Sequence, residues 1–239
     1  MQGSLDSWLW SYDATLADLV ASGKETDEGN RYAILRAYHS MADIMAATCL
    51  ASGQLEFDKY EAQFRDIVAQ SEDIALSSNS DGTSCVYRDE PGSTGRARRA
   101  WPDVSWVPPL YYTALKCRVR DVRMRAVELM EQFWRFEIIW DVGILDRASL
   151  VAREVIEMEE TGWEEQDSGD GNYKKGWVEK GDKVRLVPGE RRFDAVEMVL
   201  SDDGGSRVQI VCKKFGEGEV ETVKKVYDER KGVWIKMEG

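Results

Sequence analysis

The stretch 107-VPPLYYTALKCRVRDVRMRAVELMEQF-133 decides the fold, because its apolar residues repeat at the helical spacing of three and four. The two prolines suit a helix start, since proline lacks the N–H that the first helical turn leaves unpaired. The apolar residues that follow share one face: Leu110, Ala114 and Cys117. A second helix is predicted over about 119–132, with an inward row formed by Val119, Val122, Ala126, Leu129, Met130 and Phe133.

The same spacing predicts helices on both sides of this stretch. Upstream they span residues 5–20, about 30–51 and about 56–77, and downstream one runs from Arg147 to Glu160. In the helix over 30–51, one face is formed by Leu35, Tyr38, His39, Ala42, Met45, Ala46 and Cys49. Because only a short connection separates the helices over 30–51 and 56–77, we expect them to pack as an antiparallel pair.

The pattern changes to short alternating runs at the C-terminal end. These runs are 183–187, 193–200, 207–215, 219–227 and 232–237. SDDGGS (201–206) and GEGE (216–219) are suitable hairpin turns between them. A small antiparallel hairpin or meander is therefore predicted, and the lack of strand–helix alternation argues against a doubly wound α/β fold.

The predicted fold class is mainly α: antiparallel helix pairs, in a bundle or a short α-solenoid, followed by the small sheet. Residues 1–161 are expected to form a helical domain with an exposed, flexible insert at about 77–100, where Ser, Gly, Asp and Pro replace the periodic pattern. Residues 162–239 are expected to form an acidic linker and a β-rich C-terminal subdomain.

Composition bounds the class of protein. The 239 residues include nine tryptophans and have a formal net charge of −12, which indicates a folded chain whose overall surface repels a phosphate backbone. The cysteines are far apart and have no zinc-finger or CxxC spacing, so reduced thiols are expected at Cys49, Cys85, Cys117 and Cys212. We expect Cys49, Cys117 and Cys212 to pack as small apolar residues. Neither a signal peptide nor a membrane span is expected.

Few residues are candidates for catalysis. His39 is the only histidine, which excludes HExxH zinc sites and three-histidine metal sites. Its place on an apolar helix face favours a packed, hydrogen-bonded side chain over a general base. Cys85 lies in the predicted insert, where no fixed base would lower its thiol pKa, so an inert loop cysteine is expected.

Charged clusters are more frequent but unspecific. The acidic run Glu157, Glu159, Glu160, Glu164 and Glu165 could bind a divalent ion, but such runs usually form solvated faces. Asp202 and Asp203 lack the spacing of a calcium loop, and no glycine-rich segment matches a phosphate-binding motif. Two basic clusters could contact phosphates: Arg96, Arg98 and Arg99, and Arg118, Arg120, Arg123 and Arg125. For the second cluster we favour pairing with neighbouring acids.

The segment 107–141, followed by VAREVIEMEE at 151–160, resembles the C-terminal regulatory region of fungal binuclear zinc-cluster transcription factors, the fungal-specific transcription factor domain. In that family a PLYxxAxxCR run precedes an arginine-rich helix, a WD turn and a helix ending in VxEIEE. The matching residues are Pro109, Leu110, Tyr111, Ala114, Cys117, Arg118, Trp140, Asp141, Val155, Glu157, Glu159 and Glu160. The helix pair over 30–76 and the β-rich end also resemble the family, whereas RFEIIWD matches its RREGLWD only in part.

The resemblance implies structural packing roles for these motif residues, with no catalytic, cofactor-binding or metal-binding residue among them. Members of the family have a six-cysteine cluster that binds two zinc ions and contacts DNA. No CxxC-x6-C pattern is present here, so zinc would enter only through a cluster upstream. The chain is then either part of a longer factor or a stand-alone relative without the zinc cluster.

The expected function is a non-catalytic regulatory and protein-interaction domain of transcription, in the nucleus or the cytoplasm, without direct DNA reading. Its expected partners are proteins of the transcription machinery or a second copy of the chain. One alternative is a small-molecule-binding protein or enzyme of a fungal biosynthetic cluster, with a pocket between helices. A buried carboxylate or Cys85 within hydrogen-bond reach of His39 would favour it. Another alternative is nucleic-acid binding through the arginine-rich helix.

Overall fold

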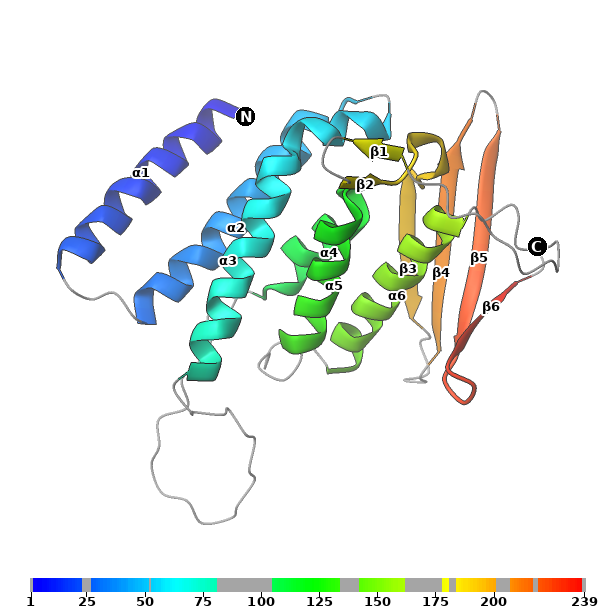
Figure 1. Cartoon of the computed structure of the whole chain (residues 1–239). Coiled ribbons are helices and arrows are strands. Elements are labelled where there is room, and N and C mark those ends of the chain that lie inside the picture. Colours follow the sequence, from blue (N-terminus) through cyan, green and yellow to red (C-terminus); the bar gives the residue numbers. More distant parts are fainter. Residues whose placement is uncertain are drawn as a thin grey trace, which may run out of the picture.

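Helices form the N-terminal part of the chain and an antiparallel sheet forms its C-terminal end, as predicted (Figure 1). The computed structural model describes residues 2–22, 27–51, 53–80, 105–133, 142–161, 178–180, 184–200, 207–216 and 219–237. The α-helices there are α1 (Gln2–Ala21), α2 (Asp27–Thr48), α3 (Glu61–Ser80), α4 (Val107–Lys116), α5 (Arg120–Phe133) and α6 (Val142–Thr161). The 3-10 helices are η1 (Gln54–Tyr60) and η3 (Gly189–Arg191). The strands are β1 (Val178–Lys180), β2 (Val184–Leu186), β3 (Ala195–Leu200), β4 (Val208–Phe215), β5 (Val220–Asp228) and β6 (Val233–Lys236).

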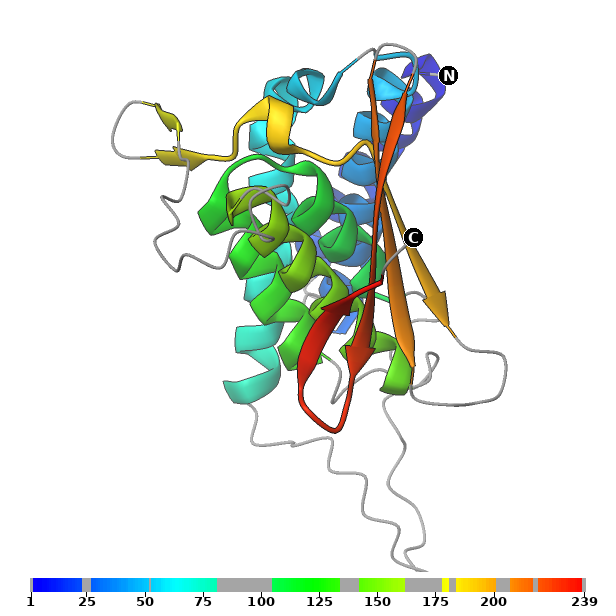
Figure 2. The ribbon, with the colours of Figure 1, turned by 90° about the vertical axis from the view of Figure 1, so that its right-hand side faces the viewer.

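The elements are arranged in successive layers. α1 lies at one end against α2, and α3, α4 and α5 follow, then α6 and finally the sheet (Figures 1 and 2). The pairs in contact include α1 with α2, α2 with α3, α4 with α5, and α5 with α6. α1 therefore lies at the far end of the molecule from the sheet (Figure 1).

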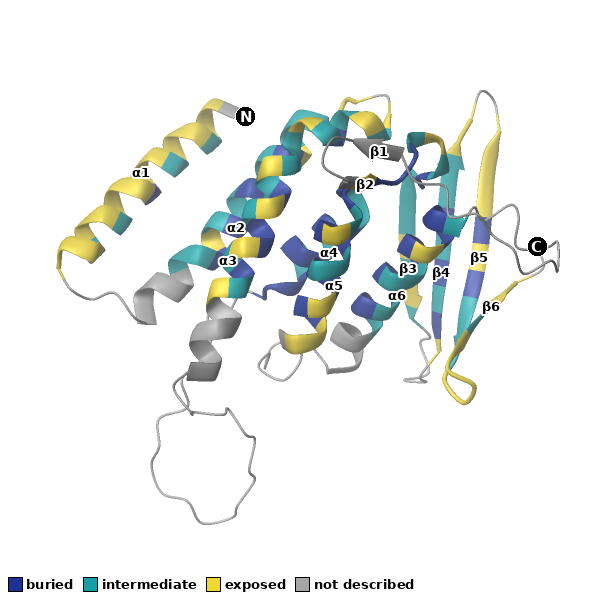
Figure 3. Ribbon diagram, in the orientation of Figure 1, coloured by how far each residue is buried: buried dark blue, intermediate teal, exposed yellow. Residues whose placement is uncertain are grey.

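A continuous apolar core joins α2 to α6 (Figure 3). Phe64, Leu110 and Leu129 are completely buried in it. Its other members include Ile34, Ala37, Ile44, Ile67, Trp106, Ala114, Ala126, Val127, Met130, Ala152 and Ile156. Most of the core residues that come from α4 and α5 belong to the inward rows predicted for the stretch 107–133.

α6 contributes to two apolar clusters. Ala148, Ala152 and Ile156 pack into the helical core. Val151, Val155 and Met158, on another face, pack against the sheet and Phe193. The predicted division between residues 1–161 and 162–239 remains a prediction, but α6 has apolar contacts on both of its sides.

The main sheet is an antiparallel meander in the order β3-β4-β5-β6. Val208, Ile210 and Cys212 alternate toward α6, and opposite Cys212 in the register stands the buried Val223. Side chains at the intervening positions face away from the helices. β1 and β2 form a separate two-stranded sheet, and Leu186 of β2 bridges to Val119.

The burial of α2 differs from the sequence prediction. The buried row is Ile34, Ala37, Ser40 and Ile44, whereas Leu35 and Met45 are 40% and 49% exposed. Cys49, expected to be packed, is exposed beyond the end of the helix. The reason is that α2 has apolar residues on two sides: one side enters the core, and α1 covers the other incompletely.

The boundaries of the third predicted helix also differ. It begins as η1 before continuing as α3, and it extends to Ser80. Residues 77–80 of the predicted insert are therefore helical, and residues 81–104 lie outside the described residues.

Replacing the buried Leu110 by alanine should lower the free energy of unfolding by about 2–5 kcal/mol, because the substitution removes apolar contacts and leaves a cavity. Leu50→Ala is the matched control, since Leu50 is 95% exposed and should change stability by less than about 0.5 kcal/mol. Urea unfolding followed by tryptophan fluorescence measures both. Equal losses for the two variants would contradict the described core.

Candidate functional site

Each arginine of the predicted basic cluster on and before α5 has an acidic partner within the chain. Arg118 lies 2.7 Å from Asp58, Arg120 lies 3.1 Å from Glu160, and Arg125 contacts Glu72 and Glu128. Arg123 lies 2.7 Å from Glu159 and is completely buried. The expected pairing with acids is therefore present, but most of the partners come from other elements rather than from α5.

The carboxyl end of α4 is the centre of a buried polar cluster. Arg123 Nε donates to the Ala114 carbonyl at 2.7 Å. Arg192, from the segment between η3 and β3, donates to the Lys116 carbonyl at 3.1 Å and to the Leu115 carbonyl. The last carbonyls of a helix lack intrahelical donors and bear the negative end of its dipole. Two guanidinium groups supply those donors, so positive charge is placed where the helix end favours it.

Glu159 of α6 provides the negative charge of this cluster. Its two carboxylate oxygens lie 2.7 Å from Arg123 Nη1 and 3.7 Å from Arg192 Nε, and it also accepts a 3.0 Å hydrogen bond from the Phe193 N–H. The three charged side chains are at most 1% exposed. Burial lowers the pKa of Arg192, and the charge of Glu159 opposes that change. We call Arg123, Glu159 and Arg192 the buried ion cluster.

Lys116 lies at the edge of the buried ion cluster. Its ammonium donates to the Asp194 carbonyl at 3.2 Å and lies 5.2 Å from the centre of the Phe57 ring. Burial, followed by repulsion from Arg192, lowers the pKa of Lys116 to about 8. This amine therefore loses its proton more readily than an ordinary lysine, although it lies against an aromatic ring.

Six of the twelve residues that match the family motif lie in α4 or directly after it, and four more lie in α6. Pro109, Leu110 and Ala114 are buried in the helix. Burial raises the pKa of the Cys117 thiol to about 11, and burial likewise raises the pKa of Tyr111. The remaining motif member of this group is Arg118, which donates to the Val187 carbonyl at 2.8 Å. Trp140 and Asp141 lie outside the described residues.

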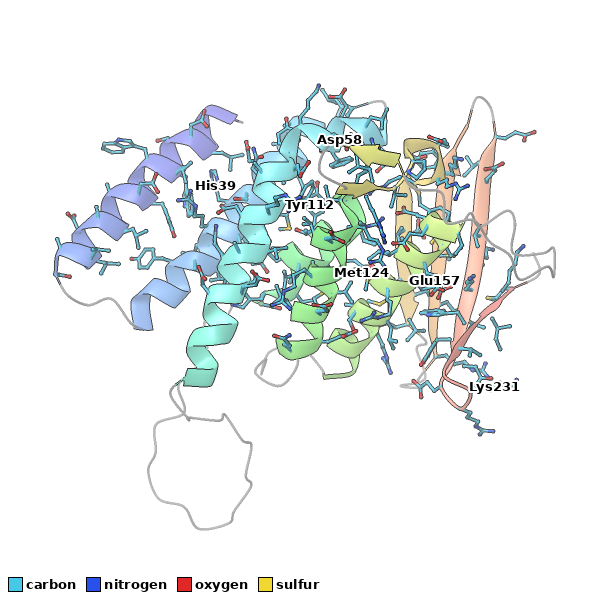
Figure 4. All side chains as sticks on the ribbon, viewed as in Figure 1. His39, Asp58, Tyr112, Met124, Glu157 and Lys231 are labelled. Atoms are coloured by element: carbon cyan, nitrogen blue, oxygen red, sulfur yellow. The ribbon has the colours of Figure 1, made fainter. Side chains whose placement is uncertain are left out.

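His39 lies between α1 and α2 (Figure 4). Its Nε2 is 2.9 Å from the Leu5 carbonyl, and its ring stacks on Trp8 with centroids 5.0 Å apart. These contacts match the packed, hydrogen-bonded histidine that the sequence favours. They attach α1 to α2, together with the Tyr12 hydroxyl that donates to the Tyr32 carbonyl at 2.9 Å.

The acidic run behaves differently from its prediction as a solvated face. Glu157 is exposed, but Glu159 and Glu160 are buried and ion-paired. Within the described ranges, no group of three or more His, Cys, Asp or Glu residues is arranged to hold a metal ion. None of the helices in that part of the chain has the length and hydropathy of a membrane span. The other candidates lie outside the described residues: Cys85, Arg96, Arg98, Arg99, Glu164, Glu165, Asp202 and Asp203.

Sequence reasoning missed the buried ion cluster. Arg123 lies four residues after Val119 and three before Ala126, so it belongs to the inward row of α5. Glu159 has the same relation to the buried Val155 on α6. A charged residue at a core position of two different helices was a detectable sign of a buried pair, whereas no local pattern indicated Arg192.

Glu159→Gln should lower the free energy of unfolding by about 3–5 kcal/mol, because it leaves two buried guanidinium groups without a counter-charge. Glu157→Gln is the matched control: it makes the same chemical change two residues away at an exposed position and should cost less than about 0.5 kcal/mol. Chemical unfolding measures the difference. Similar stability of the two variants would argue against the buried ion cluster.

Lys116 should make stability depend on pH. Its pKa is about 8 in the folded chain and ordinarily 10.5, so between these values the unfolded chain binds a proton that the folded chain lacks. The contribution of Lys116 to the free energy of unfolding therefore rises with pH across this window. Lys116→Met should remove that rise, and the difference between wild type and variant should be largest below pH 8.

The control for this experiment is Lys231→Met, which changes a lysine that is 70% exposed in the turn between β5 and β6 (Figure 4). The raised pKa of Cys117 acts in the opposite direction above pH 9, but it is common to all three proteins and cancels in the difference. Parallel stability–pH curves for wild type and Lys116→Met would contradict the lowered pKa.

Comparison of the chain with protein-family models, with curated proteins and with solved structures finds no match.

Proposed function

We propose that this chain is a non-catalytic regulatory and protein-interaction domain related to the fungal-specific transcription factor domain. It acts in transcriptional regulation in the nucleus, without reading DNA itself. The observation that most supports the absence of direct DNA reading is the ion pairing of the arginines on and before α5. Arg118, Arg120, Arg123 and Arg125 are ion-paired with acids of the same chain, so phosphate contacts would have to break existing pairs.

The proposal includes the finer prediction for the helices. In it, α2 with α3 and α4 with α5 form antiparallel pairs of a bundle or short solenoid, and contacts within both pairs support this. Stacked helix pairs present extended surfaces suited to protein partners. In this proposal the buried ion cluster at the end of α4 holds the helices together and does not take part in a reaction.

The enzyme alternative has less support from the contacts. It required a buried carboxylate or Cys85 near His39, but the hydrogen bond of His39 goes to the Leu5 carbonyl. The buried Glu159 is ion-paired with Arg123 and Arg192 instead. In this proposal the chain itself needs no cofactor, and zinc would belong only to an upstream cysteine cluster.

Fusing the chain to an unrelated sequence-specific DNA-binding module should change transcription of a reporter that contains the module's site. The module alone is the first control. The matched pair Glu159→Gln and Glu157→Gln separates a folded-state effect from a nonspecific one, since only the first breaks the buried ion cluster. The expected result is an at least severalfold reporter change that Glu157→Gln retains and Glu159→Gln reduces.

A separate DNA-binding measurement on the unfused chain tests the absence of direct DNA reading. We expect no salt-dependent binding to duplex DNA at about 50 mM salt, where phosphate contacts are strongest. Binding whose affinity falls steeply with added salt would instead favour the nucleic-acid alternative. An unchanged reporter in a chain shown to be folded would contradict the regulatory role.

A further inference from the structure

The side of the main sheet that faces away from α6 has an apolar surface. We call it the outer face. The alternate positions of β3, Val196 and Met198, pack inward on the α6 side, as does Trp234 of β6. The outer face therefore includes Val199, Val211, Val226, Ile235 and Met237, with Phe215, Val220 and Val233 at its ends.

This composition is unusual for a sheet face in contact with water. Val199 is 43%, Ile235 41% and Phe215 59% exposed. Antiparallel sheets that pack on one side normally alternate apolar residues inward and polar residues outward. Val226 pairs with Ile235, and Phe215 pairs with Val220, so the apolar side chains are cross-strand neighbours rather than scattered. Gln209, Lys213 and Thr222 lie on the same face between these pairs, so the apolar side chains form groups among polar ones. Exposed apolar groups bordered by polar residues are typical of an interaction site.

The charges on the outer face are ordered across the strands. Glu197 on β3 stands opposite Val211 on β4, and Val211 stands opposite Lys224 on β5. One row therefore reads negative, apolar, positive, with β4 in the middle. Glu197 and Lys224 are each one strand, about 4.8 Å, from β4.

A second copy of the chain complements this row. A two-fold axis along β4 in the plane of the interface places β3 of one copy over β5 of the other. Glu197 of each copy then faces Lys224 of the other, and Val211 meets its own counterpart. Aligned sheets cross at about 30°, but residues this close to the axis move by only a few ångströms, so long side chains still reach. The same operation places Val199 over Val226.

Lys213 is also on β4 and would approach its own counterpart across the axis. Its ammonium lies 2.5 Å from Glu197 within the chain, so its charge is already compensated. In the paired arrangement each Glu197 would lie between Lys213 of its own chain and Lys224 of the other copy. Such a network of charges at an interface favours one register over others.

We propose that the chain forms a two-fold symmetric dimer through the outer face of β3, β4 and β5, with β6 lying beyond the edge of the partner's β3. The proposal rests on the protein-interaction role proposed above, and it identifies the partner as a second copy of the chain. It requires no particular role in transcription.

Analytical ultracentrifugation of the full chain over a micromolar concentration range tests this. We expect a dimer for the wild type. Val211→Glu should weaken association at least tenfold, because it puts two carboxylates together on the axis. Glu197→Lys and Lys224→Glu should each weaken it. The double variant Glu197→Lys/Lys224→Glu should associate more tightly than Glu197→Lys alone, since the exchanged charges again face each other while Lys213 has lost its own partner in both variants.

The control is Glu190→Lys/Lys231→Glu, which exchanges exposed charges in η3 and in the β5–β6 turn and should leave association unchanged. Circular dichroism and unfolding curves confirm that each variant is folded. A wild type that stays monomeric at about 100 µM overturns the dimer proposal. It does not decide the regulatory role, which the reporter assay tests separately. A dimer that tolerates Val211→Glu, or is weakened by the single charge changes without rescue by the double variant, overturns this two-fold arrangement.

Discussion

The contact between Glu159 and the guanidinium groups of Arg123 and Arg192 constrains the positions of four segments at once. Removing these charges from water costs several kcal/mol for each ion, which only close pairing and further hydrogen bonds can offset. Here those bonds come from the Ala114, Leu115 and Lys116 carbonyls and from the Phe193 N–H. The end of α4, the first turn of α5, the end of α6 and the segment before β3 must therefore lie together, because displacing any one of them leaves a buried charge without its partners.

The same arrangement explains how the sheet is held on the helices. α6 has apolar side chains toward the helical core on one face and toward the sheet on another. Polar contacts from the same helix accompany this apolar packing. Lys225 of β5 lies 2.5 Å from Glu154 of α6, and Arg191 donates to the Glu160 carbonyl at 3.1 Å. Apolar burial supplies most of the attraction between the layers, but it has little directional preference. The Lys225–Glu154 ion pair and the Arg191 hydrogen bond add that preference, since each forms in only one relative position of its two elements.

Sequence periodicity was sufficient for most of the elements, because the inward rows of α4 and α5 and the alternation in β4 are local properties of the chain. It failed where an element has two apolar sides or where burial depends on a distant partner. On α2 it selected the row of Leu35 and Met45, although the core takes Ile34 and Ile44. It assigned Glu159 and Glu160 to solvent because their compensating charges come from α5, far away in the sequence. The pairing of the arginines was correctly predicted, and the neighbouring Glu128 does pair with Arg125, but the other partners were not predicted, since only tertiary structure brings acids such as Asp58 and Glu72 beside them.

The most tightly packed part of this molecule is its middle, whereas its exposed apolar residues lie mainly toward the two ends. The middle layers contain the buried ion cluster and the largest apolar core, whereas α1 contacts the remainder through α2 and has Trp10 75% exposed. The sheet lies at the opposite end, with its own exposed apolar residues on the outer face (Figure 3). A segment held by few buried contacts opens at lower free energy than the core, so α1 is the element whose local separation costs least. A stable centre can thus hold the outer face in a fixed geometry while α1 separates from α2. This combination fits the protein-interaction role proposed above.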